Sequence, residues 1–207
     1  GNSASFAILA EQVIVEINIA QPLELEGLHD IYIPTYRPTR LPIPVLKADS
    51  RIGSQAVKID PAKIVGIVFS DQTDSPSTVL PADADTQAIA GHLVEFFKNE
   101  VRQNRLTNQL MPLQAGVGTI ANAVMTGLID SPFHGMAMYS EVLQDSTFDL
   151  FEAGKLDFAS GCSMTLSERK HDAVYNNLEQ YKPKLLLRPQ EISNHPEVVR
   201  RLGIIGI

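Results

Sequence analysis

Two glycines one residue apart, Gly116 and Gly118, separate a strand-like segment from a predicted helix over residues 119–129. Glycine lets the backbone approach a ligand closely, and the first turn of a helix presents N–H groups with a partial positive charge. A turn of this kind can bind an anion or stabilise an oxyanion. By itself the pattern is also typical of a tight turn between a strand and a helix.

A carboxylate, Glu141, directly follows the next predicted strand, residues 136–140. Open α/β sheets bind their ligands at the carboxyl ends of the strands, where this side chain would lie. Most single glutamates are solvated surface residues. Glu141 stands out because the glycine turn begins 25 positions earlier, at Gly116.

That spacing fits two kinds of enzyme. Gly116, Gly118 and Ala121 match the G-x-G-x-x-G/A fingerprint of an NAD-binding Rossmann-type oxidoreductase. Glu141 would then bind the ribose, although Pro112 is unusual in the preceding strand. In the other interpretation, the glycine turn binds a thioester or a phosphate-bearing ligand and Glu141 is a covalent nucleophile. The pattern alone does not separate the two, and a non-catalytic scaffold domain is a third interpretation.

The remaining polar residues point less clearly to chemistry. The five histidines share no spacing typical of metal ligands, so we predict no metal site. Cys162 is the only cysteine, which excludes a disulfide framework, and its small neighbours predict a buried structural thiol. Arg51, Arg200 and Arg201 could reach an anion, but arginines in loops more often face water.

Composition narrows the class of protein. The 207 residues contain 17 Lys and Arg against 24 Asp and Glu, a net charge of −7, and 44% of them are hydrophobic. The acidic balance argues against nucleic acid or an anionic membrane as a partner. No apolar run approaches the ~18 residues of a membrane helix, and the start lacks a signal segment. We therefore expect a soluble globular protein of intracellular type, with one large domain or parts of two.

The elements that must position the candidate site alternate along the chain. A proline-rich extended connector spans residues 31–46, and the run 63–70 is nearly continuously apolar, as in a strand covered on both faces. Asp85 and Thr86 are suitable N-caps for an amphipathic helix over residues 86–105. Helices that alternate with buried strands predict an α/β fold. The other predicted strands are residues 13–17 and 185–187, and the other predicted helices are residues 4–12, 147–154, 167–181 and 196–202.

Both ends of the chain look cut. The sequence opens inside a helix-then-strand pattern and stops in the apolar, strand-like run RRLGIIGI, with nothing after it to pair with. Natural termini are usually polar and frayed. We therefore expect a fragment of a longer protein.

Three stretches, PLQAGVGTIANAV, YSEVLQDS and ISNHPEVVRRLG, together resemble the acetyl-CoA hydrolase/CoA-transferase family, and most closely its fungal branch. The resemblance extends over essentially the whole chain, including DSRIGS. It implies an α/β, CoA-transferase-like (NagB/RpiA-like) fold of two related domains with the active site at their junction. Residues 1–69 would be the tail of the N-terminal domain, 70–86 a connector, and 87–207 the first part of the catalytic C-terminal domain. Family members are longer, so this fragment would be inactive alone.

The same resemblance implies a role for each motif. Glu141 would be the nucleophile of an acetyl-CoA hydrolase or acyl-CoA:acetate CoA-transferase that forms a covalent glutamyl-CoA thioester, and Asn194 would lie beside it. Bacterial succinyl-CoA transferases carry an arginine in the loop that matches Ser75. A serine would not bind a succinate carboxylate as an arginine does. The loop expected to bind CoA consists of Gly116, Val117, Gly118, Thr119 and Ile120.

The partners that the resemblance implies are acyl-CoA and small carboxylates such as acetate. Coenzyme A would be a substrate, with no tightly bound cofactor. The full-length protein would be a homodimer. The fungal relatives imply a mitochondrial location and a part in acetate metabolism, with the cytoplasm as the alternative location.

Overall fold

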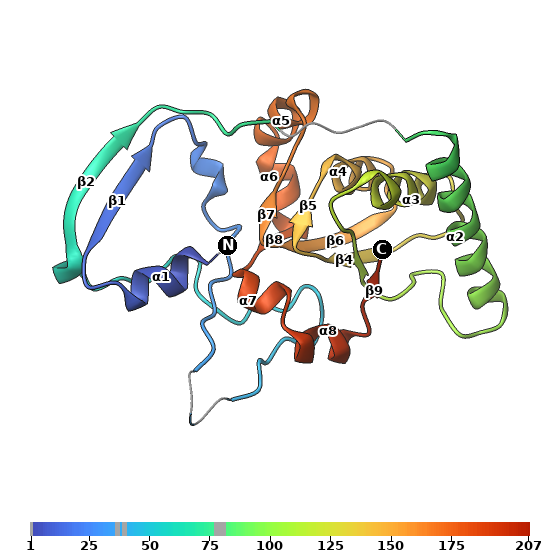
Figure 1. Ribbon diagram of the computed structural model, residues 1–207, viewed down its shortest axis with the longest axis horizontal. Coiled ribbons are helices and arrows are strands. Elements are labelled where there is room, and N and C mark those ends of the chain that lie inside the picture. The colour runs from blue at the N-terminus through green and yellow to red at the C-terminus, as the bar shows by residue number, and fades with distance from the viewer. Residues whose placement is uncertain (1, 36–37, 39–40, 77–81) are drawn as a thin grey trace.

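A parallel five-stranded sheet forms the centre of the computed structural model, which describes residues 2–35, 38, 41–76 and 82–207 (Figure 1). The strand order is β8-β6-β4-β3-β9, and every pair of neighbours is parallel. The carboxyl ends of all five strands therefore lie at one edge of the sheet, and the prediction of an α/β fold is confirmed. The strands are β3 (Leu113–Gln114), β4 (Met136–Tyr139), β6 (Leu156–Gly161), β8 (Leu185–Leu187) and β9 (Ile205–Gly206).

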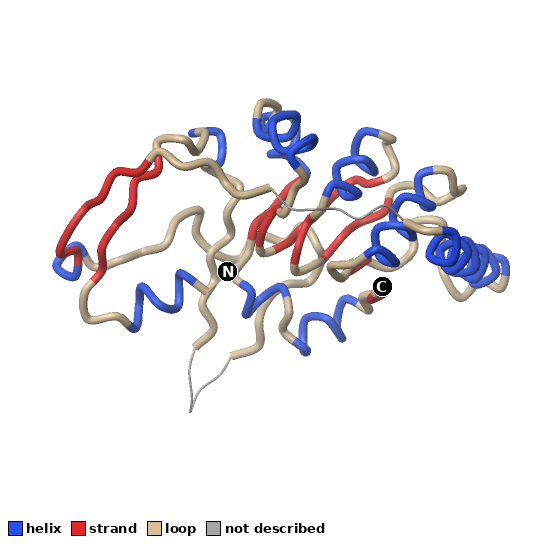
Figure 2. Tube along the Cα trace, turned by 45° about the horizontal axis from the view of Figure 1, so that its top comes forward, coloured by secondary structure: helices blue, strands red, loops and turns tan. Residues whose placement is uncertain are grey.

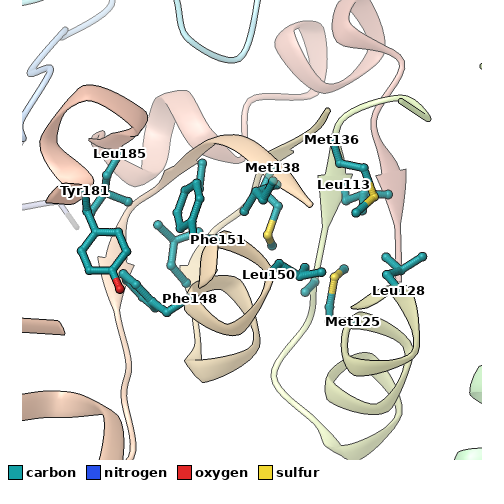
Figure 3. Packing of buried hydrophobic residues seen from close by; sticks show 14 of the residues in the cluster. Leu113, Met125, Leu128, Met136, Met138, Phe148, Leu150, Phe151, Tyr181 and Leu185 are labelled. Carbon is teal, nitrogen blue, oxygen red and sulfur yellow. The ribbon is translucent and has the colours of Figure 1, made fainter. Parts of the chain in front are cut away.

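Helices cover both faces of this sheet. Along β4, Met136 and Met138 pack into one core while Ala137 and Tyr139 pack into the other, because successive side chains of a strand point to opposite faces. Figure 3 shows the first core, where side chains of the helices meet those of the strands. The helices on that face are α2 (Ala84–Arg102), α3 (Thr119–Ile129), α4 (Asp145–Glu152), α5 (Glu168–Tyr175) and α6 (Leu178–Tyr181), and those on the other face are α7 (Gln190–Ser193) and α8 (Pro196–Leu202).

The longest helix, α2, has a different N-cap from the one predicted. The carboxylate of Asp83 accepts a hydrogen bond from the N–H of Thr86 at 2.8 Å, so the prediction of Asp85 or Thr86 as the cap is wrong. Because Asp83 is the N-cap, Thr86 lies inside the first turn of the helix. Its side chain is buried. Ala90, Val94 and Phe97 complete the buried face of α2.

A second, smaller sheet stands apart from the central one, as Figures 1 and 2 both show. It pairs β1 (Val13–Asn18) with β2 (Ile64–Ser70) in parallel. The apolar run of β2 was predicted to be covered on both faces, and this is wrong: Ile67 and Val68, which point to opposite faces, are 58% and 52% exposed. In the described chain β1 is the only strand that pairs with β2. The remaining short helices are α1 (Ser3–Leu9), η1 (Leu23–Leu25), η2 (Pro61–Lys63) and η3 (Lys182–Lys184).

Several short elements differ from the predictions. The final apolar run contains β9, which pairs with β3 through Ile205 and Leu113, so its partner precedes it in the chain. The predicted helix over 167–181 is divided into α5 and α6. The elements that were not predicted include β6, α7, and the paired strands β5 (Val142–Leu143) and β7 (Ser163–Met164).

The predicted connectors lie only partly within the structure. Residues 77–81 of the connector 70–86 fall outside the described residues, as do 36–37 and 39–40 of the proline-rich segment. The domain boundaries therefore stay a prediction. Among the described helices, none is long and apolar enough to cross a membrane.

Candidate active site

Four strands of the central sheet are each followed by a candidate functional residue or turn, and these lie together at the carboxyl edge of the sheet. The glycine turn, residues 116–118, follows β3, and Glu141 lies just beyond β4. Cys162 comes directly after β6, and Gln190 comes shortly after β8. Parallel α/β sheets bind ligands at this edge. The fold thus brings the glycine turn and Glu141, which were singled out from the sequence, to one place.

Glu141 is half-buried and is held by its neighbours on two sides. Its side-chain Oε1 accepts a hydrogen bond from Nε2 of Gln190 at 2.8 Å. Its backbone carbonyl accepts the N–H of Cys162 at 2.6 Å. Its other carboxylate oxygen accepts no hydrogen bond from the described residues. One oxygen is therefore positioned by Gln190, while the other has no donor among the described residues.

The glycine turn is tied to the strand that carries Glu141. The side chain of Gln144, which is 6% exposed, donates from Nε2 to the carbonyl of Gly116 at 3.0 Å. The hydroxyl of Ser140 donates to the carbonyl of Ala115 and accepts the N–H of the same residue. These bonds join residues 25 and 28 positions apart and hold the turn beside the carboxylate.

The turn itself is open to solvent. Val117 is 74% exposed and Ile120 is 45% exposed. Gly118 precedes the first turn of α3, and a Cβ added there would meet no atom within 4 Å. Packing within the chain therefore does not require glycine at this position. The first N–H groups of a helix lack intrahelical acceptors, so the start of α3 presents donors to an anion.

Asn194 lies one helical turn after Gln190, and its N–H donates to the Gln190 carbonyl at 2.9 Å. Its side-chain Oδ1 is buried and accepts no hydrogen bond from the described chain. The hydrogen bond that reaches Glu141 comes from Gln190 instead. The role of Asn194 beside the glutamate therefore stays a prediction. Gln190 was not predicted as a site residue, and its one signal in the sequence is its position shortly after the predicted strand 185–187.

A buried ion pair lies beneath this edge of the sheet. Arg188 is 1% exposed, and its Nη1 donates to Oδ2 of Asp30 at 2.5 Å. Its Nε also donates to the hydroxyl of Ser160 at 2.9 Å, and Nη2 donates to the Ser50 carbonyl at 2.5 Å. Burial lowers the pKa of Arg188, an effect that the charge of Asp30 opposes. This network fixes the chain that leads through Pro189 to Gln190.

The segment DSRIGS, residues 49–54, wraps around this pair. The N–H groups of Ile52 and Gly53 donate to Oδ1 of Asp30 at 2.9 and 2.6 Å. Arg51 donates to the carbonyls of Gly27 and His29, so its charged group is used within the chain. The segment therefore supports the fold next to the candidate site.

Cys162, which was predicted to be a buried structural thiol, is half-buried, and it forms no disulfide. Burial raises the pKa of its thiol, and the side chain of Ser193 opposes this effect. The charge of Glu141 adds to the increase. A neutral thiol therefore stands next to Glu141 near pH 7. The described residues contain no group of three or more His, Cys, Asp or Glu side chains arranged to hold a metal ion.

Ser75 lines a cavity of about 280 Å³ beside β7, together with Asp74 and Tyr175. The hydroxyl of Tyr175 donates to Oδ2 of Asp74 at 3.0 Å. Burial and this hydrogen bond raise the pKa of Tyr175. Among the described residues that line this cavity there is no arginine.

Comparisons with known proteins agree with the sequence resemblance. No family model matches the chain. The acetyl-CoA hydrolases of Eremothecium gossypii, Saccharomyces cerevisiae and Schizosaccharomyces pombe are 47%, 46% and 47% identical over 207 residues, all of this chain. The chain spans only 39%, 39% and 40% of those three proteins.

Solved structures share the fold at low sequence identity. RipA from Yersinia pestis gives a TM-score of 0.65 at 17% identity, over 99% of this chain and 39% of that one. A 4-hydroxybutyrate CoA-transferase from Porphyromonas gingivalis gives 0.57 at 18% identity, over 97% of this chain and 42% of that one. At these identities the likeness shows the fold alone.

Proposed function

Because the chain belongs to the acetyl-CoA hydrolase/CoA-transferase family, we propose that the protein carrying it is an acetyl-CoA hydrolase or acyl-CoA:acetate CoA-transferase in which Glu141 is the covalent nucleophile. One observation carries the assignment of the nucleophile. Glu141 lies at the carboxyl edge of the sheet beside the glycine turn, with one carboxylate oxygen bound by Gln190 and the other available.

The reaction proceeds in two acyl transfers. The carboxylate of Glu141 attacks the thioester carbonyl of acyl-CoA, which gives a mixed anhydride and releases CoA thiolate. The thiolate then attacks the glutamyl carbonyl, forming a carbon–sulfur bond and releasing the acyl group as a free carboxylate. The product is a glutamyl-CoA thioester. Acetate reverses these steps and receives CoA, whereas attack by water gives hydrolysis.

The glycine turn supports CoA as the ligand. Gly116 to Ile120 border the start of α3, where backbone N–H groups favour an anion such as a phosphate or a developing oxyanion. The open space at Gly118 leaves room for close approach by a ligand. We assign no metal or tightly bound cofactor to this reaction, because thioester exchange on a carboxylate needs neither.

The proposal extends to the complete natural protein. We propose that it is a homodimer, that it acts on acyl-CoA and small carboxylates such as acetate, and that it works in acetate metabolism in mitochondria. More than half of each fungal relative lies outside the matched region. We therefore expect the 207-residue chain by itself to turn over little acyl-CoA.

The test is to trap the covalent intermediate. The complete natural protein is incubated with acetyl-CoA, treated with borohydride and analysed by peptide mass spectrometry. Borohydride reduces a glutamyl thioester to an alcohol, so the peptide containing Glu141 should lose about 14 Da. The variant Glu141→Ala should show no such loss, while Glu11→Ala, at an exposed position outside the site, should behave as wild type. Binding of NAD(H) without any adduct would instead favour the dinucleotide interpretation and overturn the proposal.

A further inference from the structure

We propose that Gln190 is a second catalytic side chain, whose amide N–H stabilises the negative charge that develops on Oε1 of Glu141. This inference rests on the proposed function, in which Glu141 is the nucleophile. The distance from Nε2 of Gln190 to that oxygen is 2.8 Å, within the range of a good N–H···O hydrogen bond.

The position of Gln190 is fixed before any substrate binds. On one side, the N–H of Arg188 donates to the Gly161 carbonyl at 2.7 Å, and the guanidinium is locked in the buried pair with Asp30. On the other side, the hydroxyl of Tyr139 donates to the Ile192 carbonyl of α7 at 2.8 Å. A donor that is held in place costs no reorganisation when charge develops, and this is the condition for strong electrostatic catalysis.

The chemistry places the charge where this donor points. When the oxygen not bound by Gln190 attacks the acyl-CoA, it becomes the bridging oxygen of the anhydride, and Oε1 remains as the glutamyl carbonyl oxygen. Attack by CoA thiolate on that carbonyl carbon uses the sulfur electron pair to form the new bond and moves the C=O pair onto Oε1. Collapse restores the C=O bond, breaks the bond to the bridging oxygen and releases the acyl carboxylate. The negative charge thus passes from sulfur through Oε1 to the leaving carboxylate.

A neutral amide suits both stages of this reaction. In the resting state its N–H binds one oxygen of the carboxylate without neutralising the other. In the tetrahedral intermediate the same N–H lies against the full negative charge, and hydrogen bonds to charged acceptors are stronger than those to neutral ones. A merely structural role would instead appear as lost stability or lost CoA affinity.

The experiment compares Gln190→Met and Gln190→Glu with wild type in the complete natural protein. Methionine keeps the side-chain length without a donor, and glutamate keeps the shape but places a second carboxylate against Glu141. Gln180→Met is the matched control, because Gln180 is exposed on α6 and its side chain donates a hydrogen bond to Asn177 and to no other described residue. We expect kcat to fall about 100- to 1000-fold in both Gln190 variants, as for other oxyanion donors. The Kd for CoA and the thermal midpoint should stay at the wild-type values.

Failure of this inference differs from failure of the proposed function. If wild type forms the borohydride-sensitive adduct and both Gln190 variants keep kcat within about threefold of wild type, Gln190 is not catalytic although the function stands. Equal losses of CoA affinity and kcat would also overturn it, in favour of a structural role. If methionine prevents folding, the isosteric Gln190→Glu variant decides alone. If wild type forms no adduct, the proposed function fails and this inference fails with it.

Discussion

Arg188 and Asp30, 158 positions apart in the sequence, form an ion pair whose side chains are 0% and 1% exposed. The pair joins the segment before the proline-rich connector to the end of β8. Two residues beyond Arg188, Gln190 reaches the carboxylate of Glu141. The geometry of the candidate site therefore depends on a contact between distant parts of the chain.

The first prediction concerns this pair. Replacing Asp30 by alanine leaves a buried guanidinium without its counter-charge and removes the acceptor for the N–H groups of Ile52 and Gly53. We expect a loss of about 3–5 kcal/mol in the free energy of unfolding, measured by urea denaturation. The exposed pair between Lys98 and Glu95 provides the control, and Glu95→Ala should leave stability unchanged. An unchanged denaturation midpoint in Asp30→Ala would show that the pair is dispensable.

The parts of the site that follow from local signals could be predicted from the sequence. The helix over 119–129, the glycine turn before it and the strand before Glu141 each depend on neighbouring residues, and the structure has all three. The hydrogen bond from Gln190 could not be predicted, because it connects side chains 49 positions apart. The ion pair of Arg188 joins still more distant residues, and no periodicity reports such a contact.

The burial of the strands could not be predicted from the sequence pattern either. The apolar run of β2 looks like that of a strand with two covered faces, yet the sequence pattern records only the side-chain types and not which layers surround them. The two-residue strands β5 and β7 are too short to show an alternation. Their pairing depends on the ends of β4 and β6 lying side by side, which is a property of the assembled sheet.

The second prediction concerns Gly53, which packs against backbone. A Cβ at this position would overlap the carbonyl of Ile31, which cannot move because Ile31 and Ser54 exchange backbone hydrogen bonds of 2.7 and 3.0 Å. We expect Gly53→Ala to destabilise the protein by on the order of 2 kcal/mol, measured by thermal and urea unfolding. Gly91→Ala is the control, because Gly91 lies in an exposed part of α2 with no atom near the added Cβ. Alanine has a higher helix propensity than glycine, so Gly91→Ala should stabilise the protein by about 0.5–1 kcal/mol. A Gly53→Ala protein as stable as wild type would contradict the packing argument.

The third prediction is a pH dependence that comes from Tyr139. Burial raises the pKa of this hydroxyl from 10.0 to about 12, and the charge of Arg188 opposes the shift. Between pH 10 and 12 the unfolded chain therefore loses this proton while the folded chain keeps it. This difference in pKa contributes up to about 2.7 kcal/mol to the free energy of unfolding. The contribution is fully present below pH 10 and is lost as the pH rises to about 12.

Tyr139→Phe should remove this contribution to the loss of stability at high pH. Its free energy of unfolding should start about 1 kcal/mol below wild type at neutral pH, because the hydrogen bond to the Ile192 carbonyl is gone. It should then decrease less steeply than that of wild type between pH 10 and 12. Urea unfolding of both proteins across this range measures the difference. Parallel curves would show that Tyr139 ionises as easily in the folded protein as in the unfolded chain.

The last prediction separates the glycine turn from the nucleophile. Gln144→Leu keeps the buried volume but removes the only side-chain donor to the Gly116 carbonyl in the described chain. The turn should then be less well fixed, and the Kd for CoA should rise about fivefold to tenfold, which corresponds to the net contribution of one hydrogen bond. The hydrogen bond from Gln190 to Glu141 is untouched, so kcat should change far less than in the Gln190 variants. Calorimetric titration of the complete natural protein with CoA measures the effect, with Gln180→Leu as the control. If Gln144→Leu bound CoA as tightly as wild type, the turn at Gly116 would not be part of the CoA site. The assignment of Glu141 as the nucleophile would then have to stand without support from the glycine turn.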